Sequence, residues 1–271
     1  MLVNKEANIH NSLAIRSIAK YLILIESESC LEELAIFLEN HNEKVLVLGE
    51  ATNVVLPNYF DGIIVKTMLN DTNYKSRNEV ITGSSVNWDA FISWTLDNNL
   101  HGLENLTLIP GSVGAAPIQN IGAYGIEVCD FIKSVRFFDL TTNSIKEFDN
   151  SECKFGYRTS IFQSMHIIIL SVTFKFLSKP VNINYASIQD YLDTNNIDKS
   201  SLTPKGLSSI VKKIRTSKLP NPSVIPNVGS FFKNPVVQKS SINTDCFSYD
   251  DLIIWSIDQN HVKVGAARLL E

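Results

Sequence analysis

The segment GLENLTLIPGSVGAAPIQNIGAYG, from Gly102 to Gly125, says most about how this chain folds. It is rich in glycine, alanine and proline but has few charges, whereas flexible linkers are usually polar. Pro110 and Pro117 stiffen it. We therefore predict an ordered loop that packs closely against another lobe, or against a large flat or phosphorylated ligand. Its small residues leave the backbone uncovered at Gly111, Gly114, Ala115, Ala116, Gly122, Ala123 and Gly125.

A second motif, VLGEATN from Val47 to Asn53, follows an apolar run that predicts a short buried strand. A glycine at a strand end lets the backbone turn sharply and expose N–H groups that can cradle a diphosphate. The motif is not G-x-G-x-x-G, which excludes the dinucleotide-binding Rossmann fingerprint. On this motif alone, an ordinary strand-to-loop turn is the alternative.

Two later motifs carry reactive side chains. FGYRTS (155–160) places Arg158 beside an aromatic ring, and an arginine can clamp a carboxylate through two parallel hydrogen bonds. GSFFKNP (229–235) gathers a hydroxyl, two aromatics, a lysine and an amide in one turn, which suits a phosphate or a sugar. The alternatives are an exposed arginine and a helix cap followed by an apolar plug. The 5 histidines are scattered, so neither a metal site nor a Ser–His pair is predicted.

The bulk composition narrows the class of protein. The chain has 271 residues, 44% hydrophobic and 19% charged, which suits a soluble protein of two or three lobes. Its net charge is -4 without a basic tract, so we expect no nucleic-acid partner and no anionic membrane surface. Cys30, Cys129, Cys153 and Cys246 form no C-x-x-C pair, which indicates reduced thiols in the cytoplasm. We expect neither a signal peptide nor a membrane span.

Hydrophobic periodicity predicts three regions of mixed helix and strand. The first has a helix over 31–40, capped by Ser29, and strands over 44–50 and 62–66. The second has a helix over 88–99 and strands over 79–85, 132–139, 145–149 and 167–176. The third begins with a helix over 202–220, for which Thr203 is the expected cap and Pro204 the first residue.

Taken together, the motifs resemble the UDP-N-acetylenolpyruvoylglucosamine reductase family. They occur in the family's order, as LGEATN, the long segment 102–125, FGYRTSIF, RTSKLPNP and NVGSFFKNP. The resemblance covers nearly the whole chain from about Asn11 onward. It implies a cytoplasmic flavoprotein that uses NADPH and FAD to reduce UDP-N-acetylglucosamine enolpyruvate to UDP-N-acetylmuramate in peptidoglycan synthesis.

The fold that this resemblance implies is α+β. Two subdomains, 1–70 and 71–200, would bind FAD between them in the manner of vanillyl-alcohol-oxidase and PCMH-like flavoproteins. A smaller α+β substrate-binding domain would cover 201–271. The expected partners are a UDP-sugar and NADPH, with neither nucleic acid nor membrane, and the expected state is a monomer.

The resemblance also assigns roles to residues. Arg158 matches the catalytic arginine, and Ser230 the proton donor. Tyr124, Tyr185, Lys218 and Asn234 match substrate contacts. The expected FAD contacts are Leu48, Gly49, Glu50, Ala51, Thr52, Asn53, Pro110, Gly111, Ser112, Gly114, Ala115, Pro117, Ile118, Asn120, Gly122, Ala123 and Tyr124.

The sequence departs from the family pattern at two places. Ala51 and Thr52 stand where the family usually has Gly-Ser, and the Cβ of Ala51 would occupy a position where glycine can take a positive φ. The family chain continues beyond the segment that resembles VKVGAARLLE, where Arg268 replaces a usual tryptophan, and brings a further catalytic glutamate. The substrate domain is therefore expected to be incomplete. Two alternatives follow, a non-catalytic flavin-binding protein and a related FAD oxidoreductase with another substrate.

Overall fold

The computed structural model describes residues 1–177, 181–243, 245 and 248–270, so the expected thiol of Cys246 lies outside the described residues. The chain divides into two compact units, Met1–Asn227 and Val228–Glu271. The domain boundaries expected after residues 70 and 200 stay predictions.

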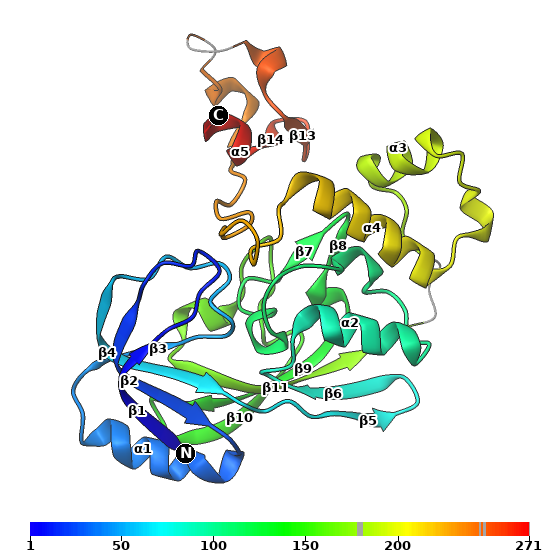
Figure 1. The fold of residues 1–271 in the computed structure, drawn as a ribbon. Coiled ribbons are helices and arrows are strands. Elements are labelled where there is room, and N and C mark those ends of the chain that lie inside the picture. Colours follow the sequence, from blue (N-terminus) through cyan, green and yellow to red (C-terminus); the bar gives the residue numbers. More distant parts are fainter. Residues whose placement is uncertain (178–180, 244, 246–247, 271) are drawn as a thin grey trace. The chain divides into compact units, whose positions relative to one another are not determined.

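The first sheet of the larger unit has the strand order β1-β2-β4-β3 (Figure 1). Strands β2 (Ile18–Ile25), β3 (Lys44–Val47) and β4 (Tyr59–Thr67) run parallel, and β1 (Leu2–Asn8) pairs with β2 in the antiparallel sense. Side chains alternate along β4, so Ile63 and Val65 pack with α1 (Leu31–Glu39), while Ile64 packs with Leu48 and Ala51 on the other face. The turn that follows β3 is thereby anchored to the sheet.

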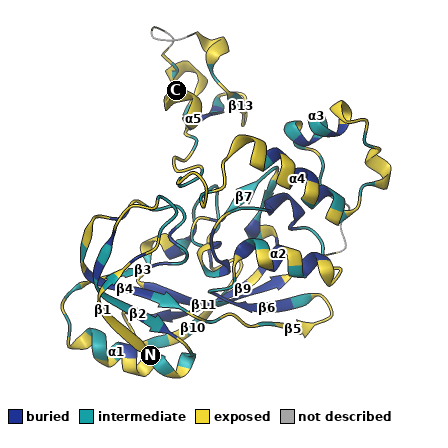
Figure 2. Cartoon of the chain, viewed as in Figure 1, coloured by how far each residue is buried: buried dark blue, intermediate teal, exposed yellow. Residues whose placement is uncertain are grey.

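The second sheet has the order β10-β9-β11-β6-β5 and is antiparallel throughout. Its core contains four fully buried aromatic side chains, those of Trp88 and Phe91 in α2 (Trp88–Asp97) and those of Phe137 and Phe174 in the sheet. Figure 2 shows the buried strands of this sheet. The strands are β5 (Thr72–Ser76), β6 (Glu79–Gly83), β9 (Ile132–Asp139), β10 (Ser144–Asp149) and β11 (Ile167–Lys175).

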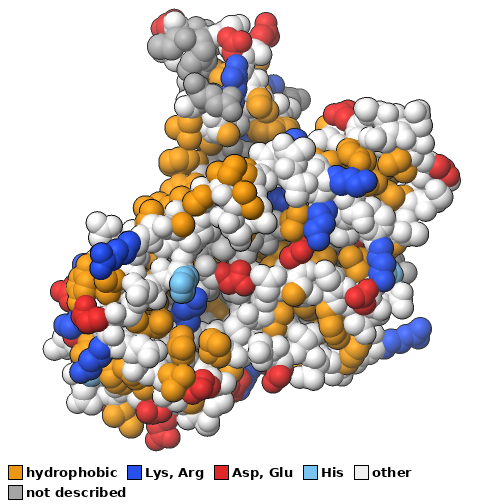
Figure 3. All heavy atoms as spheres, viewed as in Figure 1, with side chains coloured by type: hydrophobic (Ala, Val, Ile, Leu, Met, Phe, Trp, Pro, Cys, Tyr) orange, Lys and Arg blue, Asp and Glu red, His pale blue; other side chains and the backbone are white. Residues whose placement is uncertain are grey.

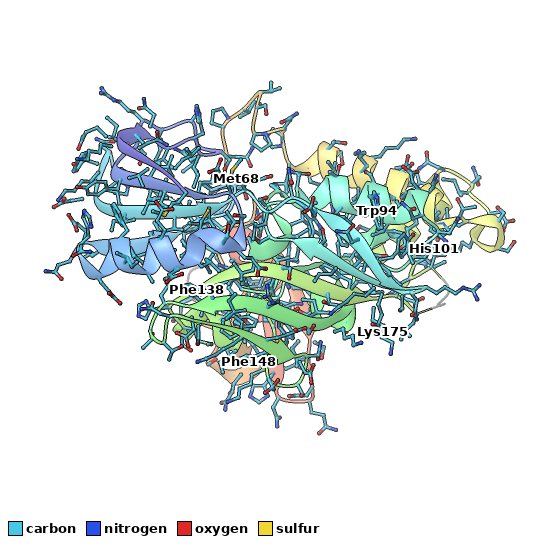
Figure 4. The ribbon with its side chains drawn as sticks, turned by 90° about the horizontal axis from the view of Figure 1, so that it is seen from below. Met68, Trp94, His101, Phe138, Phe148 and Lys175 are labelled. Carbon is cyan, nitrogen blue, oxygen red and sulfur yellow. The ribbon has the colours of Figure 1, made fainter. Side chains whose placement is uncertain are left out.

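The two sheets of this unit share hydrophobic side chains. Phe138, Ile168 and Leu170 of the second sheet belong to the same buried cluster as Leu34 of α1 and Ile63 of β4. Figure 4 shows Phe138 directed from β9 toward α1. Because one core serves both sheets, the loops that leave them are held in fixed relation.

A helical hairpin completes the larger unit. Helices α3 (Ala186–Thr194) and α4 (Pro204–Lys218) bury Ile188, Leu192, Leu207 and Val211 between them. The short strands β7 (Gly122–Ala123) and β8 (Ile126–Glu127) pair nearby. The unit also has the 3-10 helices η1 (Glu28–Cys30), η2 (Glu104–Leu106), η3 (Val113–Ala115), η4 (Val128–Asp130), η5 (Ile161–Ser164) and η6 (Lys199–Ser201).

The smaller unit is a three-stranded antiparallel sheet with one short helix. Its order is β12-β14-β13, and it buries Val262 and Val264 while Ile253 and Ile257 stay exposed. Its elements are β12 (Val236–Gln238), β13 (Ile254–Ser256), β14 (His261–Val264), α5 (Ala266–Leu270), η7 (Lys239–Ser241) and η8 (Tyr249–Asp251).

Most of the predicted elements are confirmed. The strand over 132–139 has the predicted limits, and Thr203 accepts a hydrogen bond from the backbone N–H of Gly206 at 3.1 Å as the predicted cap of α4. The cap predicted at Ser29 is wrong, because Ser29 lies inside η1 and Cys30 precedes α1 without a side-chain cap. Among the described residues, no helix combines the length and the apolar character needed to cross a membrane.

Candidate functional site

The two glycine-rich motifs meet in the folded chain. A Cβ added to Gly49 would lie 2.7 Å from the Oγ atom of Ser112 and 3.4 Å from the Cβ of Ala115. A Cβ on Gly111 would lie 3.3 Å from the Oγ1 atom of Thr52. Since only glycine permits so close an approach, the turn 49–53 and the loop 110–117 form one continuous surface.

Most N–H groups of the loop 110–117 donate to carbonyl groups of the protein itself. Val113 donates to the carbonyl of Val86 at 2.9 Å, and Gly114 to that of Ser84 at 2.9 Å. Although its small residues leave the backbone uncovered, most of the N–H groups in this loop are therefore paired within the protein.

The turn 49–53, which packs against this loop, has backbone N–H groups without a protein acceptor among the described residues. Within the described part of the chain, the N–H groups of Gly49, Glu50, Ala51 and Thr52 donate to no protein acceptor, nor do those of Gly111 and Ser112. Ala51 has a φ of 53°, which confirms the positive φ expected at this position. Consecutive N–H groups around a left-handed residue form a concave anion site, so this turn fits a diphosphate.

A half-buried lysine lies near this turn. Lys66 follows Val65 at the end of β4 and so faces the same side of the sheet as Ile64 and Leu48. Burial lowers the pKa of Lys66, an effect that the charge of Glu50 partly opposes. Glu50 is itself held by Asn87, whose Nδ2 donates to Oε1 at 3.0 Å. Lys66 was not among the predicted site residues, although its position directly after the apolar run GIIV is a usable signal.

Arg158 is fixed against the second half of the glycine-rich segment. Its Nη1 atom donates to the carbonyl of Asn120 at 3.2 Å and lies 3.4 Å from the Oε1 atom of Glu127, and Nη2 donates to the carbonyl of Gly122. Its side chain is 30% exposed, and its Nε–H donates to none of the described residues. The guanidinium therefore keeps a donor for a ligand.

Asn120 organises this arginine site from within the protein. It is fully buried, and its Nδ2 donates to Glu127 at 2.9 Å and to the carbonyl of Gly156 at 3.0 Å. Its Oδ1 accepts from the N–H of Cys129 at 3.1 Å. A Cβ on Gly122 would lie 2.8 Å from Nη1 of Arg158, so the guanidinium packs directly on the backbone.

Several residues of this site have left-handed backbone, as do others elsewhere in the chain. Ala51, Asn120, Tyr124 and Arg158 have φ values of 53°, 44°, 49° and 53°. Each such residue costs about 1–2 kcal/mol relative to ordinary backbone, so the surrounding contacts must enforce it. Strain of this kind is enriched at binding and catalytic sites.

The two candidate substrate tyrosines lie together. The rings of Tyr124 and Tyr185 pack edge to face with 5.4 Å between their centroids. Burial lowers the pKa of Arg215 of α4, and the neighbouring Tyr124 opposes that change. Arg215 lies in the RTSKLPNP motif but was not among the predicted site residues. Lys218, which was predicted, lies exposed in the last turn of α4. Figure 3 shows basic side chains along this helix.

The remaining candidates lie in the smaller unit. Ser230 is exposed and follows Gly229, which has a φ of 61°. The Oδ1 atom of Asn234 accepts from the N–H of Ala266 at 2.9 Å, so this side chain also caps α5. Among the described residues, no group of three His, Cys, Asp or Glu side chains is placed to hold a metal ion.

Gly114→Ala should destabilise the loop 110–117. The new Cβ would lie 2.5 Å from the Cβ and 3.0 Å from the carbonyl oxygen of Ser84, so backbone must move. We expect a loss of about 1–3 kcal/mol in the free energy of unfolding and weaker FAD retention. Gly206→Ala is the control, because alanine favours the α4 helix and meets only side-chain atoms at 3.2 Å. Equal urea midpoints for the two variants would contradict this packing argument.

Comparisons with known proteins agree with this geometry. A family model described as an FAD binding domain matches residues 19–148, which confirms the expected α+β FAD-binding fold. A UDP-N-acetylenolpyruvoylglucosamine reductase of Flavobacterium johnsoniae is 38% identical over 97% of this chain and 79% of its own length. One of Aliivibrio fischeri is 34% identical over 100% of this chain and 78% of its own. The crystal structure of the Thermus caldophilus reductase is similar with a TM-score of 0.62, at 20% identity over 83% of this chain and 71% of that one.

Proposed function

The chain belongs to the UDP-N-acetylenolpyruvoylglucosamine reductase family, and from that premise we propose how its residues carry out the family's reaction. It is an FAD-dependent oxidoreductase that reduces UDP-N-acetylglucosamine enolpyruvate to UDP-N-acetylmuramate with NADPH, a step of peptidoglycan synthesis. The main support for this proposal is the turn 49–53, whose unused N–H groups lie against the loop 110–117. Asn120 and Gly122, which hold Arg158, follow that loop directly in the sequence. When bound, FAD supplies the redox chemistry, passing a hydride from NADPH to the enolpyruvyl carbon.

The cofactor site comprises the turn 48–53 and the loop 110–124. We propose that the N–H groups of Gly49 to Thr52 hold the diphosphate, with Lys66 adding positive charge nearby. Gly111 and Gly114 keep the loop close enough to the turn to enclose the ligand. The other proposed contacts, carried by the resemblance, are Leu48, Asn53, Pro110, Ser112, Ala115, Pro117, Ile118, Asn120, Gly122, Ala123 and Tyr124.

Arg158 is proposed to hold the substrate carboxylate. Hydride addition to the enolpyruvyl double bond leaves an enolate-like charge on that carboxylate side. A guanidinium already fixed by three acceptors needs little reorganisation to stabilise this charge. Its Nε–H and its remaining exposure fit such a contact.

Ser230 is proposed to deliver the proton. The enolate-like intermediate is basic enough to take a proton from a neutral hydroxyl, so no histidine partner is needed. Ser230 is exposed at a turn that begins with the left-handed Gly229. This assignment rests on the match of NVGSFFKNP to the family motif.

The sugar nucleotide is proposed to contact Tyr124, Tyr185, Lys218 and Asn234, with 201–271 as the substrate domain. Arg215 joins this set, because it is half-buried and lies beside Tyr124, and its pKa is lowered by burial. A desolvated arginine is well suited to a phosphate.

Arg215→Met should weaken binding of the sugar nucleotide. Methionine keeps the apolar contacts but removes the charge, and a charge-assisted hydrogen bond contributes about 1.5–3 kcal/mol. We expect KM to rise by about tenfold or more. Lys213→Met is the control, since Lys213 is an exposed cation on the same helix. A KM unchanged in Arg215→Met would show that Arg215 serves the fold alone.

The function is tested on the purified chain. It should retain FAD through gel filtration and oxidise NADPH only when the enolpyruvyl nucleotide is added, with UDP-N-acetylglucosamine as the unreactive control. A folded, colourless protein that takes up no FAD would contradict the cofactor site. A yellow protein without substrate-dependent oxidation would favour a flavin-binding protein of another function.

We also propose that the chain acts as a monomer in the cytoplasm, where NADPH and nucleotide sugars are available. The free thiols of Cys30, Cys129 and Cys153 are consistent with a reducing compartment. Light scattering would check the mass, and a dimer would contradict the first half of this proposal.

A further inference from the structure

The side chain of Asn105 joins two segments that are far apart in the sequence. Its Nδ2 donates to the carbonyl of Tyr124 at 2.9 Å and to the carbonyl of Asn182 at 2.8 Å. One acceptor belongs to the glycine-rich segment, and the other lies just before Tyr185 and α3. Both amide protons of a single side chain are thereby used to hold two loops at a fixed separation.

Asn105 is itself immobilised. It is 1% exposed and lies in η2, whose neighbouring residues Leu103 and Leu106 belong to the core of the second sheet. Helix α4 also lies on η2, where the hydroxyls of Thr107 and Ser208 are 2.8 Å apart. The side-chain amide of Asn105 therefore ties the two loops to a rigid part of the core.

The loops so held present the two tyrosines. Tyr124 packs edge to face on Tyr185, and the Nδ2 of Asn182 makes a longer contact of 3.5 Å with the carbonyl of Gly125. Asn105 provides the shorter link between the segments. Without it, the carbonyls of Tyr124 and Asn182 would lose this donor, and among the described contacts mainly the apolar packing of the two rings on the helical hairpin would be left to set their spacing.

We propose that Asn105 is a positioning residue for the sugar nucleotide, because it sets the separation of Tyr124 and Tyr185. This inference rests on the proposed function of the tyrosine site. Asn105 acts through the loops and does not contact the substrate. Its loss should weaken substrate binding, with little effect on the chemical step.

The test compares Asn105→Ala with Asn150→Ala. Asn150 is a matched control, because its Nδ2 also donates to two carbonyls, those of Cys129 and Ile132, at 2.8 Å each. Asn105→Ala should raise KM for the enolpyruvyl nucleotide by about tenfold and change kcat by less than about threefold. Hydrogen exchange of the amides in 181–185 should accelerate in this variant and stay unchanged in the control.

A double-mutant cycle separates positioning from general destabilisation. If Asn105 acts through Tyr185, adding Asn105→Ala to Tyr185→Ala should raise KM by no more than about twofold. Additive effects overturn the inference, as does an unchanged KM with faster exchange. Should Asn105→Ala fail to fold, Asn105→Ser is the substitute, because serine keeps one donor. It should raise KM by about threefold and leave kcat nearly unchanged. A wild-type chain that never oxidises NADPH with this nucleotide overturns the proposed function itself.

Discussion

Replacement of Arg158 by alanine should lower kcat for the enolpyruvyl nucleotide by about 10²- to 10³-fold, the usual effect of removing one preorganised donor to a developing negative charge. The guanidinium is fixed by the carbonyls of Asn120 and Gly122 and by Glu127. It is therefore already in place when charge forms on the substrate carboxylate. FAD should stay bound, because the turn 49–52 does not depend on this side chain.

Three variants decide whether the guanidinium acts by its charge, its shape or its position. Arg158→Lys keeps the charge but not the planar fork, and should recover only part of the rate. Gly122→Ala leaves Arg158 intact but puts a Cβ 2.8 Å from Nη1, so it should also slow the reaction. Arg77→Ala, at an exposed arginine in the β5–β6 turn, is the control. Stopped-flow measurement should show flavin reduction by NADPH nearly unchanged, and loss of that step instead would refute the assigned role.

The regular elements of the second sheet were predictable because their side chains report their environment directly. The apolar run 167–176 and the alternating segment 132–139 are buried on one or both faces, and such burial requires a sequence of that kind. The helix α2 was predicted from its helical spacing of apolar residues, which includes Trp94 (Figure 4). The ring centroid of Trp94 lies 5.4 Å from that of Tyr74 in the β5–β6 hairpin.

The first strand, β1, was not predicted, for a physical reason. Strand β1 is exposed at almost every position, so its sequence LVNKEAN carries no burial pattern. It forms because it adds an edge to β2, with pairs such as Val3 to Ile23. Strand β1 forms because it pairs with a segment that is distant in the sequence. Its own seven residues are therefore not enough to predict it.

The site shows a similar division. The glycine positions predicted the close approach of turn and loop, because a Cβ is excluded there by sterics. The sequence could not show that packing would consume the N–H groups of Val113 and Gly114, leaving those of the turn 49–52 unused. It also could not show that Asn120 and Asn105 would be buried, since the neighbours that bury them come from distant segments.

Ser230→Ala should produce the second large effect, a fall of about 10²- to 10⁴-fold in the rate of product formation, the range expected for a lost general acid. The hydroxyl is needed only after the hydride has reached the enolpyruvyl carbon, since the neighbouring carbon must then take a proton. Reduction of the bound flavin by NADPH should therefore continue at close to the normal rate. Reoxidation of the reduced enzyme by the enolpyruvyl nucleotide should become the slow step.

Ser230→Cys tests the acid role more sharply than alanine does. A thiol has a pKa of about 8.5 and can still give up a proton, so this variant should recover part of the lost rate. Ser241→Ala is the matched control, because Ser241 is another exposed serine of the smaller unit, with its hydroxyl 2.7 Å from the carbonyl of Gln238. If Ser230→Ala slowed flavin reduction as much as reoxidation, the hydroxyl would be acting in binding. If Ser230→Cys were no better than alanine, proton donation by this side chain would be refuted.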